Sequence, residues 1–291
     1  VRTSPDVQLH IHFSYFNATW NESKQAWIQD YSEYDLANLP YDRVRDMIVR
    51  GKKLLEDTCR KAKSDYECYV FRAANWSMQP SPSIVKALVQ EGFRIDTSVW
   101  KYGRYDDLVK FDYSGAHSDL VPWPIDERDV CRRDPSGKLF EFPIYTEQQP
   151  LWVFLTPNRV YRVIAQRLNP LPEPDPMSGG STAAPASVRA SLPNRLLGKA
   201  TKAIARQPWK VDFNQCTGRQ LIRALQRVEA RYGHPSVPLP FVLIGHSKTF
   251  TAHNERSLRP FLEFVRDNPA RFSFGTFADF EPESYREPVA A

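Results

Sequence analysis

The stretch "YVFRAANWSMQPSPSIVKALVQEGFRIDTSVW", residues 69–100, sets the pattern on which the fold depends. Its apolar start predicts a short strand at 69–73. A helix is expected within "SPSIVKALVQEGF", because Ser81 can cap it, Pro82 suits the first helical position and Gly92 can end it. Its apolar face would consist of Ile84, Val85, Leu88 and Val89. A strand followed by such a helix is the unit from which parallel α/β sheets are built.

The same alternation extends in both directions along the chain. Further strands are expected at 7–14, 139–145, 241–244 and 272–277, and further helices at 41–64, at 158–168, at 217–232 and from Asn254 or Ser257 onward. Residues 169–191 are rich in Pro, Gly, Ser and Ala, which predicts a mobile insertion within a single domain. The pattern favours an α/β barrel or a doubly wound sheet, with functional side chains at the C-terminal ends of strands.

Composition restricts the classes of function. The 39 basic and 34 acidic residues give a net charge of +5 that is spread along the chain, without the basic block typical of a nucleic-acid-binding tail. No run of about 18 apolar residues is present to cross a membrane. The four cysteines have no metal-ligand spacing, so they are expected to be buried thiols or to include a Cys59–Cys68 bridge. The 13% of aromatic residues fits either sugar binding or an aromatic core.

Two residues compete for a catalytic role in "FVLIGHSKTF", residues 241–250. Ser247 stands where a nucleophile-elbow serine would stand, but Thr249 occupies a position at which such a turn usually needs Gly. The histidine after it, His253, is too close in sequence to serve as the base of an α/β-hydrolase. We therefore expect His246, rather than Ser247, to carry the chemistry.

Polar residues alternate with apolar ones in "VQLHIHFS", residues 7–14, so His10 and His12 should share one face of a strand. Two imidazoles placed in this way can hold a divalent ion such as zinc, or they can be ordinary polar residues of a half-buried strand. Arg72 follows the apolar "YVF", where a guanidinium needs an anionic partner; a simple buried ion pair would also meet that need.

In this order, the segments "DVQLHIHF", 69–100 and "FVLIGHSKTF" resemble the polysaccharide deacetylase family of carbohydrate esterases, also called the NodB-homology family. "EFPIY" and "FSFGTFADF" extend the resemblance over nearly the whole chain. It implies a distorted (β/α) barrel, and a divalent ion, most often zinc, held by one aspartate and two histidines. It also implies that an N-acetylated amino-sugar glycan or a lipid-linked sugar is deacetylated.

The resemblance assigns a role to each candidate residue. His10 would be the first metal ligand and His12 the second, while Arg72 would orient a catalytic aspartate. His246 would be the general acid, and Asp212 would tune it. Asn75 and Trp76 would line the sugar groove, although Trp76 is equally expected as a core aromatic.

Two departures from the family pattern accompany these roles. Ser14 occupies the position of the usual second metal histidine, and the family's Asp-Asp motif does not precede the histidine strand. We therefore expect the chain to be a truncated form, inactive as it stands, of a cytoplasmic or cell-envelope-associated enzyme. The alternative is a non-catalytic glycan-binding homologue of the same fold.

Overall fold

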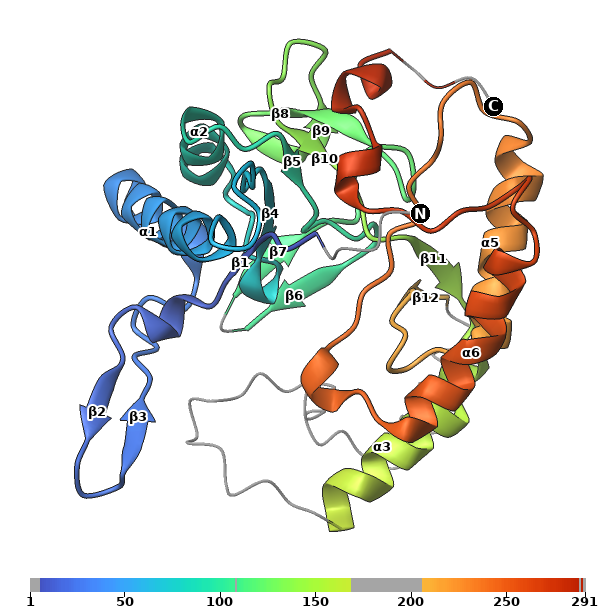
Figure 1. Ribbon diagram of the computed structural model, residues 1–291, viewed down its shortest axis with the longest axis horizontal. Helices are drawn as coiled ribbons and strands as arrows, with labels where there is room; N and C mark the ends of the chain where they lie inside the picture. Colours follow the sequence, from blue (N-terminus) through green and yellow to red (C-terminus); the bar gives the residue numbers. More distant parts are fainter. Residues whose placement is uncertain (1–5, 108, 169–205, 288, 290–291) are drawn as a thin grey trace, which may run out of the picture. The chain divides into compact units, whose positions relative to one another are not determined.

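The computed structural model describes residues 6–107, 109–168, 206–287 and 289. The chain divides into two compact units (Figure 1). The first unit consists of residues 1–145, 229–242 and 273–291, and the second of residues 146–228 and 243–272. The predicted insertion at 169–191 lies outside the described residues.

A six-stranded sheet forms the centre of the first unit. Its strands, in spatial order, are β1 (Leu9–Ile11), β4 (Val70–Ala73), β5 (Ile95–Asp96), β10 (Phe140–Glu141), β8 (Trp123–Asp126) and β9 (Asp129–Arg133). The first four run parallel, and β8 and β9 add antiparallel strands at one side. This confirms a mixed α/β architecture. The described strands pair as an open sheet, so the deacetylase-type barrel remains a prediction.

Two helices pack against this sheet. Helix α1 (Tyr41–Cys59) buries Val44, Met47 and Ile48, and α2 (Pro82–Gln90) joins β4 to β5 as the Ser81–Pro82 signal predicted. Helix α1 lies beside β1, and α2 lies beside α1 (Figure 1). At Gly51 of α1, an added Cβ would come 2.9 Å from the Ile11 side chain. The glycine therefore allows α1 to lie close to β1.

The remainder of the first unit consists of two hairpins and short helical turns. The hairpins are β2 (Thr19–Asn21) with β3 (Ala26–Ile28), and β6 (Arg104–Asp106) with β7 (Lys110–Asp112). The short turns are η1 (Phe13–Tyr15), η2 (Leu36–Asn38), η3 (Ala74–Trp76), η6 (Phe277–Asp279) and η7 (Pro282–Tyr285).

The strand predicted at 272–277 is wrong. Residues 272–276 form no ladder, and Thr276 starts a capping box for η6 instead. Phe277, the last residue of the predicted strand, instead packs its ring edge-on against Phe142, as do Phe280 and Tyr285 after it.

The second unit contains the antiparallel pair β11 (Thr146–Gln149) and β12 (Gln207–Lys210). It also contains η4 (Leu151–Phe154), α3 (Pro157–Leu168), most of α5 (Gly218–Tyr232), η5 (Ser247–Thr249) and α6 (Ala252–Arg266). The last helix starts earlier than predicted, because Thr251 caps it through a capping box with Asn254.

The buried strand predicted at 241–244 is reduced to two isolated parallel bridges. Val242 pairs with Ile144 in the first unit, and Ile244 pairs with Asp212 in the second. The predicted free thiols are confirmed: all four cysteines are unbridged, and all except Cys59 are buried. Within the described part of the chain, no helix combines the length and apolarity needed to cross a bilayer.

Candidate functional site

The two histidines predicted to share a face do so. Leu9, Ile11 and Phe13 are buried, whereas His10 and His12 between them are exposed, and the two imidazole centroids are 4.9 Å apart. The Nδ1 atom of His10 lies 3.0 Å from the Arg72 carbonyl oxygen. Because a carbonyl can only accept, Nδ1 carries a proton, and in the neutral ring Nε2 then carries the lone pair. This is the arrangement by which a backbone carbonyl orients a metal-ligating histidine.

Ser14 is not part of this face. It is buried, and its hydroxyl donates to the Gln29 side-chain oxygen at 3.2 Å. The physical reason is that the extended backbone ends at His12 and the 3₁₀ turn η1 begins at Phe13. The two-residue period that places His10 and His12 together therefore stops before position 14.

The donor set fits a zinc-like ion only in part. Imidazole nitrogen is a preferred ligand for such ions, but a catalytic zinc usually has three protein ligands. Among the residues that the structure describes, no group of three or more His, Cys, Asp or Glu side chains could hold a metal ion. The described chain thus provides two of the ligands expected.

Arg72 lies next to the histidines. It is the β4 partner of His10 in the sheet register, so both side chains project from the same face. Its Nε donates to the Thr97 carbonyl at 3.2 Å. Burial lowers the pKa of the Arg72 guanidinium, and the charges of Asp96 and Glu141 raise it. No described carboxylate forms an ion pair with Arg72, so this half-buried cation can still accept an anionic partner.

Two carboxyl groups are buried on the opposite face of the same sheet. Asp96 and Glu141 are direct partners across β5 and β10, and each is fully inaccessible to solvent. The Val99 N–H donates to Glu141 at 2.9 Å, and the Ser98 hydroxyl donates to Asp96 at 2.7 Å. The second oxygen of each carboxyl group is buried without a donor from another side chain or the backbone.

Burial favours the neutral form of both groups. Desolvation raises the pKa of Asp96, and it raises the pKa of Glu141 well above its ordinary value, with the charge of Asp96 as the next cause. Each group is therefore easier to protonate in the folded protein than in water, because burial disfavours the charged form.

Sequence reasoning gave neither carboxyl group a role. In the sequence, Asp96 lies within the segment 69–100 and Glu141 within "EFPIY", as parts of the family resemblance only. The sequence signal that could have revealed them is an acidic residue between apolar residues in a predicted strand. Such a residue is expected to be buried, and a buried acid needs a proton or a partner.

The structure favours a packing role for Trp76. It is half-buried against the core, and its carbonyl oxygen accepts a hydrogen bond from the Tyr113 hydroxyl. Asn75 precedes it with a left-handed φ of 54°, and the Asn75 side chain bonds to Tyr34. The sugar-binding role of both residues remains a prediction.

His246 belongs to the second unit, where it is exposed on a loop after Ile244. Its backbone is held by Asn214: the His246 N–H donates to the amide oxygen at 2.6 Å, and the amide nitrogen donates to the His246 carbonyl at 3.3 Å. Asp212 organises this turn, because one carboxylate oxygen accepts from the Asn214 N–H at 2.9 Å and the other from the Gln215 side chain at 2.5 Å. Its tuning of the His246 ring remains a prediction.

Gly245, which suggested a nucleophile elbow, is required for a different reason. A Cβ at Gly245 would lie 2.1 Å from the Phe213 ring, so only glycine fits at this position. Ser247 then begins the 3₁₀ turn η5 rather than an α-helix. The strand-turn-helix context of an elbow is therefore not present at Ser247.

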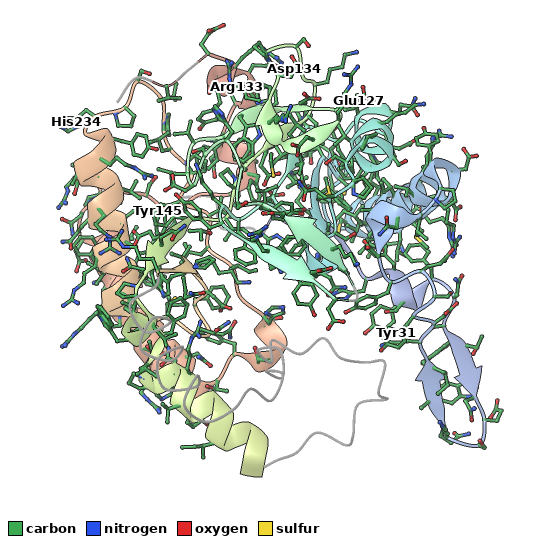
Figure 2. The ribbon with its side chains drawn as sticks, turned by 180° about the vertical axis from the view of Figure 1, so that it is seen from behind. Tyr31, Glu127, Arg133, Asp134, Tyr145 and His234 are labelled. Carbon is green, nitrogen blue, oxygen red and sulfur yellow. The ribbon has the colours of Figure 1, made fainter. Side chains whose placement is uncertain are left out.

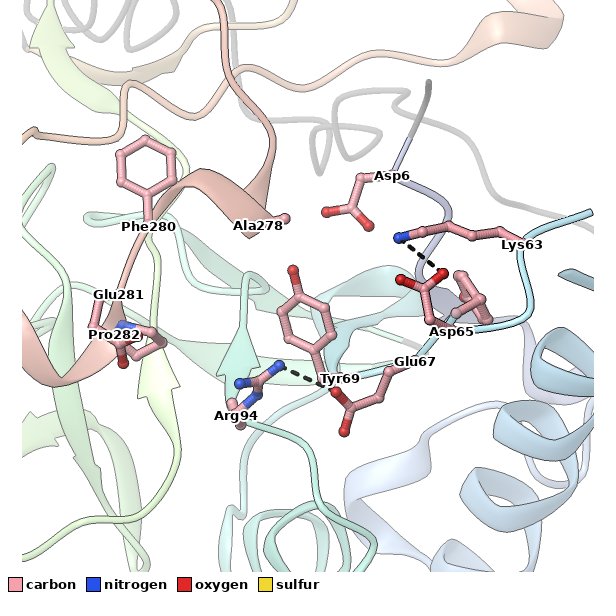
Figure 3. A pocket seen from close by; sticks show the side chains of 11 residues that line it. Asp6, Lys63, Asp65, Glu67, Tyr69, Arg94, Ala278, Phe280, Glu281 and Pro282 are labelled. Atoms are coloured by element: carbon pink, nitrogen blue, oxygen red, sulfur yellow. Dashed lines mark hydrogen bonds and ion pairs between the residues drawn. The ribbon is translucent and has the colours of Figure 1, made fainter. Parts of the chain in front are cut away.

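A separate cavity of about 270 Å³ opens near the N-terminal ends of β4 and β5 (Figure 3), and none of the predicted site residues lines it. Its walls include Asp6, Tyr69, Arg94 and Phe280, with ion pairs between Lys63 and Asp65 at 3.8 Å and between Arg94 and Glu67 at 3.3 Å.

Comparisons with protein-family models, with curated proteins and with solved structures gave no match. The assignment to the polysaccharide deacetylase family therefore remains a prediction from the sequence motifs.

Proposed function

We propose that the histidine face of β1 is the metal-binding part of a carbohydrate N-deacetylase site, which removes an acetyl group from an N-acetylated amino-sugar glycan. The observation that carries this proposal is the contact of His10 Nδ1 with the Arg72 carbonyl at 3.0 Å, next to the exposed His12. This contact leaves the His10 Nε2 lone pair in the form that a metal ion requires.

His10 and His12 would hold the ion. A zinc-like ion bound at such a site supplies Lewis-acid polarisation of an amide carbonyl and lowers the pKa of water. The chain's own contribution is to fix the tautomer of His10 through the Arg72 carbonyl and to keep both rings on one exposed face.

Arg72 would position an acidic group at this face. Its guanidinium projects on the histidine side of the sheet and forms no ion pair with a described carboxylate. A carboxylate brought beside it would be kept ionised and oriented by a charge-assisted hydrogen bond, as a general base requires.

His246 is our candidate for the proton donor to the departing amine, which is a poor leaving group without a proton. Its backbone is fixed by Asn214, and Asp212 holds the turn that contains Asn214. This role rests on the resemblance of "LIGH" to the last family motif.

Metal titration of the whole chain tests the proposal. We expect one Zn²⁺ or Co²⁺ per chain in isothermal titration, and loss of that binding in His10→Ala and His12→Ala. His234→Ala is the matched control, because His234 is also an exposed histidine of the first unit. Equal metal binding by all four proteins would contradict the metal site.

Acetate release from chitohexaose tests the chemistry. If deacetylation occurs, His246→Ala should reduce it by roughly 100-fold or more while metal binding is retained. Unchanged turnover in this variant would remove His246 from the mechanism.

A second function has a specific observation in its favour. The described residues provide only two metal-ligand candidates in this region, which suits a homologue that binds glycan without catalysis. Binding of chitohexaose by a metal-free chain that releases no acetate would support this function over the enzyme.

A further inference from the structure

The β2–β3 hairpin presents two tryptophans to solvent. Trp20 and Trp27 are direct partners across the two strands, with ring centroids 5.7 Å apart and ring planes 66° apart. Trp20 is 43% exposed and Trp27 is 65% exposed. The hairpin extends from the part of the chain that follows η1 (Figure 1), and Tyr31 lies at its base (Figure 2).

The orientation of the hairpin is the reverse of what packing alone would favour. Trp20 and Trp27 occupy its more exposed face, while Ala26 and Ile28 alternate with them on the half-buried face. Burying the largest apolar side chains would gain the most free energy. A cross-strand pair of aromatic residues stabilises a hairpin, but it does not require that the pair face solvent.

The hairpin has a defined shape. The Asn21 side-chain oxygen accepts from the Lys24 N–H at 2.9 Å and from the Ser23 hydroxyl at 2.8 Å, which fixes the turn. At its base, the Asp30 N–H donates to the Ser14 carbonyl at 3.1 Å. A ligand would therefore meet rings that are already positioned, which lowers the entropic cost of binding.

Exposed aromatic rings also connect the hairpin to the histidine face. Tyr15 is 59% exposed, and its ring centroid lies 6.0 Å from that of His12. Four residues separate Tyr15 from Trp20, so exposed aromatic rings stand both beside His12 and on the hairpin that follows. A ligand that contacts all three rings must cover more than one of these positions.

The charge of this region indicates the class of ligand. Between residues 15 and 31, Lys24 contributes one positive charge and Glu22 and Asp30 one negative charge each, which gives −1. Such a surface does not attract nucleic acid or anionic lipid. A neutral ligand with flat apolar faces, such as a pyranose ring, matches exposed tryptophan rings.

We propose that Trp20, Trp27 and Tyr15 form a binding surface for a neutral polysaccharide chain whose next units reach the histidine face. The inference rests on the proposed deacetylase function and refines it: the substrate is a polymer or long oligomer, not a single sugar or a lipid-linked sugar. The binding surface contains no proposed metal ligand, so its structure does not require a bound metal ion.

Titration calorimetry with chitohexaose and chitobiose tests this surface. Trp27→Ala should weaken chitohexaose binding by roughly three- to tenfold and leave chitobiose binding unchanged. Trp152→Ala is the matched control, since Trp152 is 64% exposed but lies in the second unit. Far-ultraviolet circular dichroism would show whether Trp27→Ala disturbs the hairpin. In that case Trp27→Phe is the second variant: it keeps an aromatic ring and should restore most of the affinity.

The outcomes separate this proposal from the deacetylase proposal. Trp27-dependent binding of chitohexaose without acetate release would support the surface and leave the enzyme unsupported. Acetate release with equal chitohexaose affinity in the wild type and Trp27→Ala would overturn the surface alone. If Trp152→Ala lost as much affinity as Trp27→Ala, the proposed binding surface would be overturned. Trp27-dependent binding to phosphatidylcholine vesicles without binding to chitohexaose would also overturn it.

Discussion

The same sheet carries two pairs of titratable side chains in opposite surroundings. His10 and His12 stand on an exposed strand face, where water can reach the rings. Asp96 and Glu141 are fully buried on neighbouring parallel strands, and burial raises the pKa of each. The exposed pair is available to a ligand and contributes little to stability, whereas the buried pair cannot reach a ligand and affects the free energy of unfolding. Burial, rather than residue type, separates the two roles.

The largest effect on stability is expected from Glu141→Ala. The change leaves the Val99 N–H without its acceptor and opens a cavity beside the buried Asp96. We expect a loss of about 3–5 kcal/mol in the free energy of unfolding, measured by urea denaturation. Glu67→Ala, at an exposed glutamate paired with Arg94, is the control. Equal losses in the two variants would show that the buried pair has no special role.

A smaller loss is expected from Ser14→His, which restores the family's histidine spacing. Ser14 is buried and bonds to Gln29, so the larger ring should overpack the site and cost about 1–3 kcal/mol. The same variant should bind Zn²⁺ no more tightly than the wild type, because position 14 does not share the histidine face. A gain in zinc affinity would show that η1 can rearrange to bring this position to the metal.

The buried pair should also make stability depend on pH. Because the pKa of each carboxyl group is raised in the folded protein, the folded state binds more protons than the unfolded state above the ordinary Glu value of 4.5. Stability is therefore greatest below this window and falls as the pH rises through it, by at most about 1.4 kcal/mol per pH unit for one proton. Urea denaturation over this range should give a flatter profile for Glu141→Gln, and an unchanged slope would argue against the raised pKa of Glu141 as its cause.

The smallest effect on the metal-free protein is expected at the histidines. His10→Ala and His12→Ala should each change the free energy of unfolding by less than about 0.5 kcal/mol, because both side chains are exposed. Added Zn²⁺ at about 100 times the dissociation constant should stabilise the wild type by about 2.7 kcal/mol and should not stabilise these variants. The same zinc response in His10→Ala as in the wild type would place the ion elsewhere.

Local sequence patterns predicted the elements that depend on neighbouring residues. The Ser81–Pro82 start gave α2, and the alternation over 7–14 gave the shared face of His10 and His12. The failures occurred where distant residues decide the structure. A strand is predicted at 272–277, but packing of Phe277 against Phe142 and the Thr276 capping box give a turn instead.

By itself, the sequence determined the α/β alternation and the histidine face, because periods of two and 3.6 residues fix which side chains share a surface. Only the tertiary structure decided that Asp96 and Glu141 meet, that Ser14 turns away from the histidines and that Trp20 and Trp27 face solvent. These outcomes depend on strand register, on where the extended backbone ends and on which face of a hairpin is covered. Such features arise from contacts between residues far apart in the chain, and no local period encodes them.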